Sequence, residues 1–150
     1  MDKRALRNAL NQLLTVLERS MPMYLSYAAP WTRNGDDKAV TALRRIVEEQ
    51  QALANRVAEL VLELGPTNVG DYPVEYYDMH DLALDYLLGK LVEYQKRDIG
   101  KVERIVDQIQ THRPAAALAE ETLGTLRAQQ ETLEELADEL GASKVTWMMP

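Results

Sequence analysis

Apolar side chains recur every three or four residues along four long segments of this chain, and no segment shows the strict alternation of a β-strand. Each segment therefore carries its apolar residues on one face of a helix, which only other helices can bury. The sequence predicts an all-α protein. The expected helices cover about 2–28, 36–64, 78–111 and 114–140, and a C-terminal tail follows at 141–150.

The connectors between these helices predict the topology. Two of them are short, so each should join an antiparallel pair. The connector Gly65 to Tyr77 has thirteen residues and spans at most about 43–47 Å when extended. The second helix should be about 43 Å long at 1.5 Å per residue. The connector can therefore run the length of the bundle as one long crossover, which makes the second and third helices parallel.

Four residues should end or bend helices within this pattern. Gly65 and Pro66 should stop the second helix, and Gly141 should stop the fourth. Pro22 should kink the first helix, because proline cannot donate a hydrogen bond to the carbonyl of the residue four positions earlier.

Composition limits the classes of protein. A chain of 150 residues suits a single domain, 1–150, and its lack of cysteine excludes disulfides and thiolate metal sites. A formal charge of −7 with scattered basic residues disfavours nucleic acid as a partner. No apolar run approaches the ~20 residues of a membrane span. We expect a cytoplasmic protein that does not bind membranes.

Three stretches resemble the ferritin-like superfamily, especially its bacterioferritin and rubrerythrin branch. They are LNQLLTVLERSMPMYLSYA (10–28), RVAELVLELG (56–65) and RAQQETLEELADEL (127–140). The resemblance implies a ferritin-like four-helix bundle with one long crossover between helices two and three. It also implies a di-metal centre built from one glutamate on each of two helices and a Glu-x-x-His pair on each of the others.

The ligands of that centre are replaced in this chain. In the aligned stretches, Leu17 stands at the first glutamate position, Gln50 and Leu53 at the second helix's pair, and Gln129 and Thr132 at the fourth helix's pair. Gln95 is the nearest polar residue on the corresponding face of helix three. The two histidines, His80 and His112, would lie about 48 Å apart along one helix. We therefore expect no cofactor and no metal.

The three glutamines suggest two interpretations. They could form a polar core layer whose amides bond to each other, to Thr132 or to a buried water, and this interpretation is favoured because neutral amides avoid the cost of buried carboxylates. They could instead remain from a metal site that now takes a new ligand. A carboxylate-only metal site elsewhere is a further alternative, and its candidate ligands are Glu48, Glu49, Glu93, Glu121 and Glu131.

Two segments could form an interaction surface. The first, DYPVEYYDMHDLALDYL (71–87), clusters Tyr72, Tyr76 and Tyr77 near His80, although such aromatics more often pack on the bundle while Asp78 and Asp81 cap the next helix. The second is the tail with Trp147 and Met148, which we expect to fold back onto its own bundle or onto a dimer mate.

Catalytic signatures are missing from the sequence, which shows no Ser/His/Asp arrangement, phosphate-binding glycine loop or dinucleotide fingerprint. We expect a non-catalytic scaffold or interaction protein. The alternatives are a divergent iron-handling oxidase with relocated carboxylates and a small-molecule-binding bundle with the polar layer as its pocket floor. Apolar residues off the main helix faces predict a homodimer; they are Met23, Trp31, Tyr94, Trp147 and Met148.

Overall fold

The computed structural model describes residues 1–28, 36–79 and 82–148, and for residues 141–148 it describes the backbone alone. It confirms the all-α fold. The helices are α1 (Lys3–Glu18), α2 (Met21–Ala28), α3 (Asp37–Leu62), the 3₁₀ helix η1 (Val74–Tyr76), α4 (Leu84–Gln108) and α5 (Arg113–Met148). Within the described ranges, every helix is too short or too polar to cross a membrane.

The first predicted helix is divided into α1 and α2, so the expected kink is a complete break. Asp2 caps α1 by accepting a hydrogen bond from the backbone N–H of Ala5 at 2.7 Å. Helical hydrogen bonding stops at Arg19 and Ser20, and α2 then starts with Met21 and Pro22. Proline lies in the first turn of α2, where a helix needs no N–H donor, so the break is less costly than a proline inside one continuous helix.

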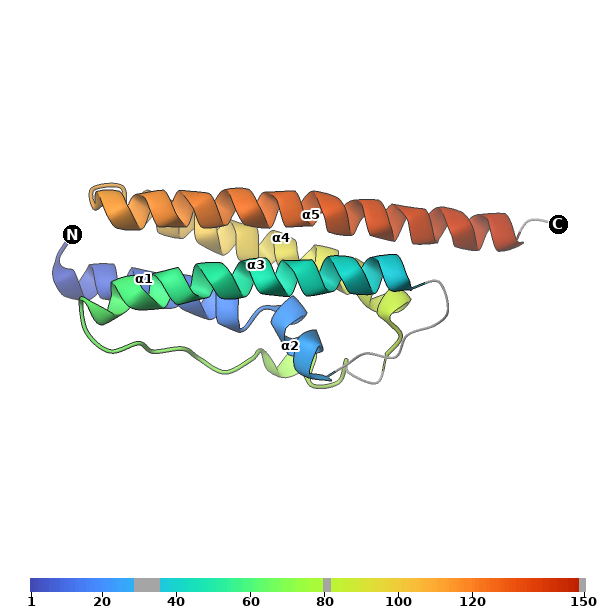
Figure 1. The fold of residues 1–150 in the computed structure, drawn as a ribbon, viewed down its shortest axis with the longest axis horizontal. Helices are drawn as coiled ribbons and strands as arrows, with labels where there is room; N and C mark the ends of the chain where they lie inside the picture. The colour runs from blue at the N-terminus through green and yellow to red at the C-terminus, as the bar shows by residue number, and fades with distance from the viewer. Residues whose placement is uncertain (29–35, 80–81, 149–150) are drawn as a thin grey trace.

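The segment 63–79 runs back along the side of the bundle, as Figure 1 shows, so that α3 and α4 point the same way. Gly65 starts this crossover with a φ of 151°, a backbone angle that residues with a side chain rarely adopt. Helix α3 ends at Leu62, two residues before the expected end. Helix α1 packs mainly on α3, and α4 packs mainly on α5.

Two helix boundaries differ from the sequence prediction. Helix α4 starts at Leu84 rather than near Asp78, because residues 74–76 form the separate 3₁₀ helix η1. Ala83, which precedes α4, has no capping side chain. The expected cap Asp78 lies in a turn, and Asp81 lies outside the described residues. Helix α5 continues through Gly141 to Met148 and extends past the start of α3, so the backbone of residues 141–148 does not fold back. One glycine costs a helix only about 1 kcal/mol.

The buried apolar residues form two clusters along the bundle. One cluster includes Leu10, Leu14 and Val57 and fills the half where α1 packs on α3. The other includes Tyr24, Leu88 and further residues around α2, η1 and the start of α4. Along α5, Leu126 belongs to the first cluster and Leu133 to the second, so the two clusters meet near the middle of that helix.

Candidate functional site: a glutamine layer and two grooves

Three glutamines on three helices meet between the two apolar clusters. Gln50 on α3, Gln95 on α4 and Gln129 on α5 are 1%, 1% and 2% exposed. The Gln129 Oε1 atom accepts hydrogen bonds from Gln50 Nε2 at 3.0 Å and from Gln95 Nε2 at 3.1 Å. We call these three side chains the glutamine layer. Bonds among these amides involve three of their six side-chain nitrogen and oxygen atoms.

The network extends from the glutamine layer to the break between α1 and α2. The Ser20 hydroxyl donates to Gln50 Oε1 at 2.6 Å and accepts from the backbone N–H of Met23 at 3.4 Å. At the opposite side, Gln129 Nε2 donates to Glu49 Oε1 at 3.3 Å. One chain of hydrogen bonds therefore links α2, α3, α4 and α5. The Gln95 Oε1 atom is buried without a partner.

Thr132 does not belong to this layer, which corrects the sequence prediction. Its side chain is exposed and its hydroxyl donates to the Ala128 carbonyl at 3.3 Å, within its own helix. It lies three residues after Gln129, which rotates it about 60° away from the buried face. Leu17 and Leu53, the other aligned positions, are buried in the apolar cluster that includes Leu10.

These residues do not fit the di-metal centre that the resemblance implies. Two leucines offer no ligand atom, and the glutamine amides are weak iron ligands that already bond to each other. Among the relocated candidates, Glu48, Glu93, Glu121 and Glu131 are exposed, and Glu49 is half-buried. Glu93 pairs with Arg97 at 3.0 Å, and Glu121 pairs with Arg56 at 2.7 Å, which lowers the pKa of the Glu121 carboxyl. Across the described part of the chain, no three metal-binding side chains come together.

Comparisons with protein-family models, with curated proteins and with solved structures found no significant match.

A groove of about 570 Å³ lies between α3 and α5, beside the glutamine layer. Gln129 lines it together with Glu49, Thr132 and Arg45. Since Gln129 is almost completely buried, we infer that its amide lies at the floor of this α3–α5 groove, while the exposed Thr132 lies nearer the surface.

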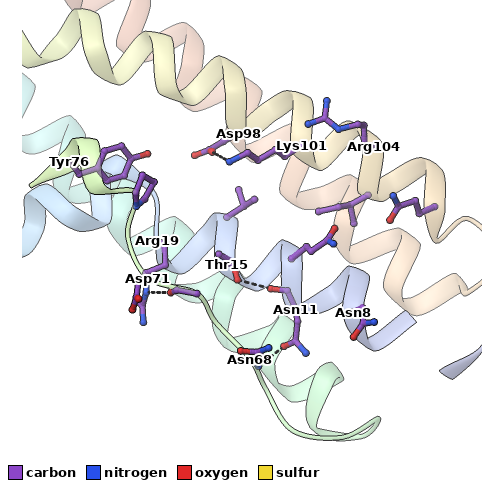
Figure 2. Close-up of a pocket in the computed structure, with 16 residues that line it drawn as sticks. Asn8, Asn11, Thr15, Arg19, Asn68, Asp71, Tyr76, Asp98, Lys101 and Arg104 are labelled. Carbon is purple, nitrogen blue, oxygen red and sulfur yellow. Dashed lines mark hydrogen bonds and ion pairs between the residues drawn. The ribbon is translucent and has the colours of Figure 1, made fainter. Parts of the chain in front are cut away.

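A second groove of about 710 Å³ lies between α1, the crossover and α4. Figure 2 shows Asn11 and Thr15 of α1, Tyr76 of the crossover, and Asp98 and Lys101 of α4 around this α1–α4 groove. Asp98 is only 7% exposed. Burial raises the pKa of its carboxyl to about 7, and the Lys101 ammonium partly opposes that rise.

The crossover tyrosines pack on the bundle. Tyr76 is buried, with its ring centroid 5.1 Å from that of Tyr94 and 5.9 Å from that of Tyr24. Tyr72 is half-buried beneath the Arg19 guanidinium, 5.1 Å from its ring. Only Tyr77, which is 48% exposed, offers a large surface to a partner.

The remaining predicted surface residues divide into two groups. Met23 and Tyr94, which we expected at a dimer interface, are buried inside the protomer and pack there instead. His80 and Trp31 lie outside the described residues, as do the side chains of Trp147 and Met148.

Sequence reasoning missed two residues of these sites. The sequence does contain a signal for Ser20, because a serine two residues before a proline is typical of a helix start. A new helix starting there implies that the first helix is broken at the level of the glutamines. Asp98 lies between Gln95 and Val102 on α4, and all three residues are buried. A charged residue on an otherwise buried face marks either a pairing site or a ligand site.

Proposed function

We propose that this protein is a non-catalytic, ferritin-like bundle that acts as a self-associating scaffold or interaction protein. The observation that carries the proposal is the glutamine layer. It occupies the middle of the bundle with neutral amides that bond to one another, where the resembling family places metal ligands. A layer of this kind stabilises the bundle without metal and leaves no reactive group in its centre.

The crossover supports the ferritin-like part of this proposal. A plain up-and-down bundle needs only a short turn between its second and third long helices, whereas in this chain the crossover brings α3 and α4 parallel.

Exposed apolar side chains support self-association. They include Tyr27, Val74 and Tyr86, which are 82%, 78% and 56% exposed. Such residues in a symmetric interface would be buried twice, once on each protomer. The expected solution mass is twice the 17.0 kDa of one chain. Light scattering that gives the monomer mass at high micromolar concentration would argue against a self-associating scaffold.

Metal loading tests the proposal that the protein is non-catalytic and holds no metal centre. The purified protein is incubated anaerobically with iron(II) or manganese(II), desalted and analysed for bound metal. We expect less than stoichiometric metal in the wild type and in a Gln129→Ala, Thr132→Ala double variant. Stoichiometric metal in the wild type that the double variant loses would mean that the glutamine layer is a working metal site.

The α3–α5 groove favours a second candidate, a small-molecule-binding bundle with the glutamine layer as its pocket floor. Gln129 and Glu49 offer an amide and a carboxylate to a ligand there, and the groove volume of about 570 Å³ falls within the range of small-molecule pockets. A fragment screen by NMR distinguishes the candidates. Fragments that shift Thr41, Arg45 and Thr132, and that no longer bind after Thr41→Trp narrows the groove, would favour the small-molecule role.

A further inference from the structure

The α1–α4 groove is separate from the glutamine layer and contains a polar group that the proposed scaffold role does not use. The Asp98 carboxylate receives no hydrogen bond from the part of the chain that the structure describes. Its nearest cation, Lys101 Nζ, is 3.9 Å away, which is too far for a hydrogen bond, and the Lys101 side chain is 55% exposed. The Asp98 oxygens are not among the fully buried unpaired atoms, and the residue lines the groove, so a donor from outside the chain can bond to them there.

Figure 2 shows what such a donor would meet. The Asp98 carboxylate and the Tyr76 hydroxyl point toward one another from α4 and from the crossover, and both residues line the groove. Burial raises the pKa of the Tyr76 hydroxyl, so the phenol remains neutral and can accept or donate a hydrogen bond. Two oxygens that converge from different elements suit a group with several donors.

We propose that the α1–α4 groove binds a small primary amine whose protonated amino group lies between Asp98 and Tyr76. An ammonium group has three donors and a positive charge, so it can bond to both oxygens and compensate the charge of the carboxylate. A hydroxyl group would supply one donor and no charge.

The other charged side chains in the groove restrict the charge that the rest of the ligand can carry. Lys101 and Arg104 line it beyond Asp98, whereas its other carboxylate, Asp71, is exposed to solvent, so a second positive charge on the ligand is disfavoured. Arg19 is already engaged, because its Nε donates to the Gly70 carbonyl at 2.8 Å and its guanidinium covers the Tyr72 ring. The ligand is therefore a monoamine with a neutral or anionic remainder, and not a polyamine.

The test uses n-butylamine as the probe, followed by NMR chemical shifts of the full chain. With five non-hydrogen atoms, its expected dissociation constant is on the order of 1 mM at pH 8. At pH 6 we expect about tenfold weaker binding, because a carboxyl with a pKa of about 7 is mostly protonated there. Asp98→Asn should abolish binding. Asp71→Asn, a matched change at an exposed residue of the same groove, should leave it within about twofold.

A second variant keeps the test valid if Asp98→Asn does not fold. At pH 9, where the Asp98 carboxyl is ionised, Lys101→Gln should tighten n-butylamine binding because it removes the competing ammonium. The proposal is overturned if n-butylamine does not bind at 50-fold the expected constant, if n-butanol or butyrate binds equally well, or if Lys101→Gln weakens binding.

Discussion

Replacing Gln129 by glutamate tests whether the glutamine layer depends on its neutrality. The new carboxylate would keep the acceptor oxygen that binds Gln50 and Gln95, but its second oxygen would replace the Nε2 that lies 3.3 Å from Glu49 Oε1. Two carboxylate oxygens would then face each other at a nearly completely buried position. Both burial and the neighbouring charge raise the pKa of the introduced carboxyl.

Asp98 provides a measure of the size of this effect. Its carboxyl, buried in the same bundle, has its pKa raised to about 7. A rise from the ordinary glutamate value of about 4.3 to about 7 corresponds to roughly 3.7 kcal/mol at pH 8 and about 1 kcal/mol at pH 5. The two retained N–H donors reduce the loss and Glu49 increases it. We therefore expect the free energy of unfolding to fall by about 2–4 kcal/mol at pH 8.

The sign of the pH dependence follows from proton binding. With the folded pKa raised, the folded state holds more protons than the unfolded state between about pH 4.3 and 7, so stability falls as pH rises through that window. Urea unfolding followed by circular dichroism at pH 5 and pH 8 measures it. Gln51→Glu, the same change at an exposed neighbour of Gln50, is the control and should change stability by less than about 0.5 kcal/mol at both pH values. A Gln129→Glu protein as stable as this control at pH 8 would refute the argument.

Three further predictions use the same unfolding assay. Asp98→Asn should reduce the difference in unfolding free energy between pH 5 and pH 8 by about 2.7 kcal/mol, because the raised pKa of about 7 makes the wild type lose stability as pH rises toward 7. An unchanged difference would mean that burial does not raise the pKa of the Asp98 carboxyl. Gly65→Ala should cost about 1–3 kcal/mol because of the φ of 151°, and a neutral result would mean that the turn can relax. Tyr76→Leu should lower the free energy of unfolding by about 1.5–3 kcal/mol through lost ring contacts, whereas Tyr86→Leu, at a side chain that is 56% exposed, should lower it by less than about 0.5 kcal/mol. Equal losses of stability would argue that the ring contacts of Tyr76 do not stabilise the bundle.

Periodicity and connector length predicted the helices and the crossover because both depend on local chain geometry. The positions of Gln50, Gln95 and Gln129 on buried faces followed from the same spacing. The prediction for Thr132 was wrong because it did not come from helical spacing. Thr132 was assigned to the layer by alignment with a ligand motif, although three residues of rotation carry it off the buried face.

The α1–α4 groove could not be predicted from the apolar pattern of any single helix, because its walls come from α1, α4 and the crossover together. Asn11 holds the crossover in place there, because its side-chain oxygen accepts from the backbone N–H of Asn68 at 2.9 Å and its amide donates to the Pro66 carbonyl at 3.4 Å. These contacts join residues more than fifty positions apart in the chain. Sequence patterns of single helices carry no information about them.

The separation of the core into two apolar clusters also affects how the molecule opens. Directional hydrogen bonds of the glutamine layer, rather than continuous apolar packing, connect the two halves, so one half can lose its packing while the other keeps it. The half that contains Tyr24 depends on α2, an eight-residue helix that is too short to be stable alone, and on the irregular crossover. Its backbone amides should therefore exchange with deuterium through a partial unfolding, while those around Leu10 and Val57 exchange only when the whole bundle unfolds.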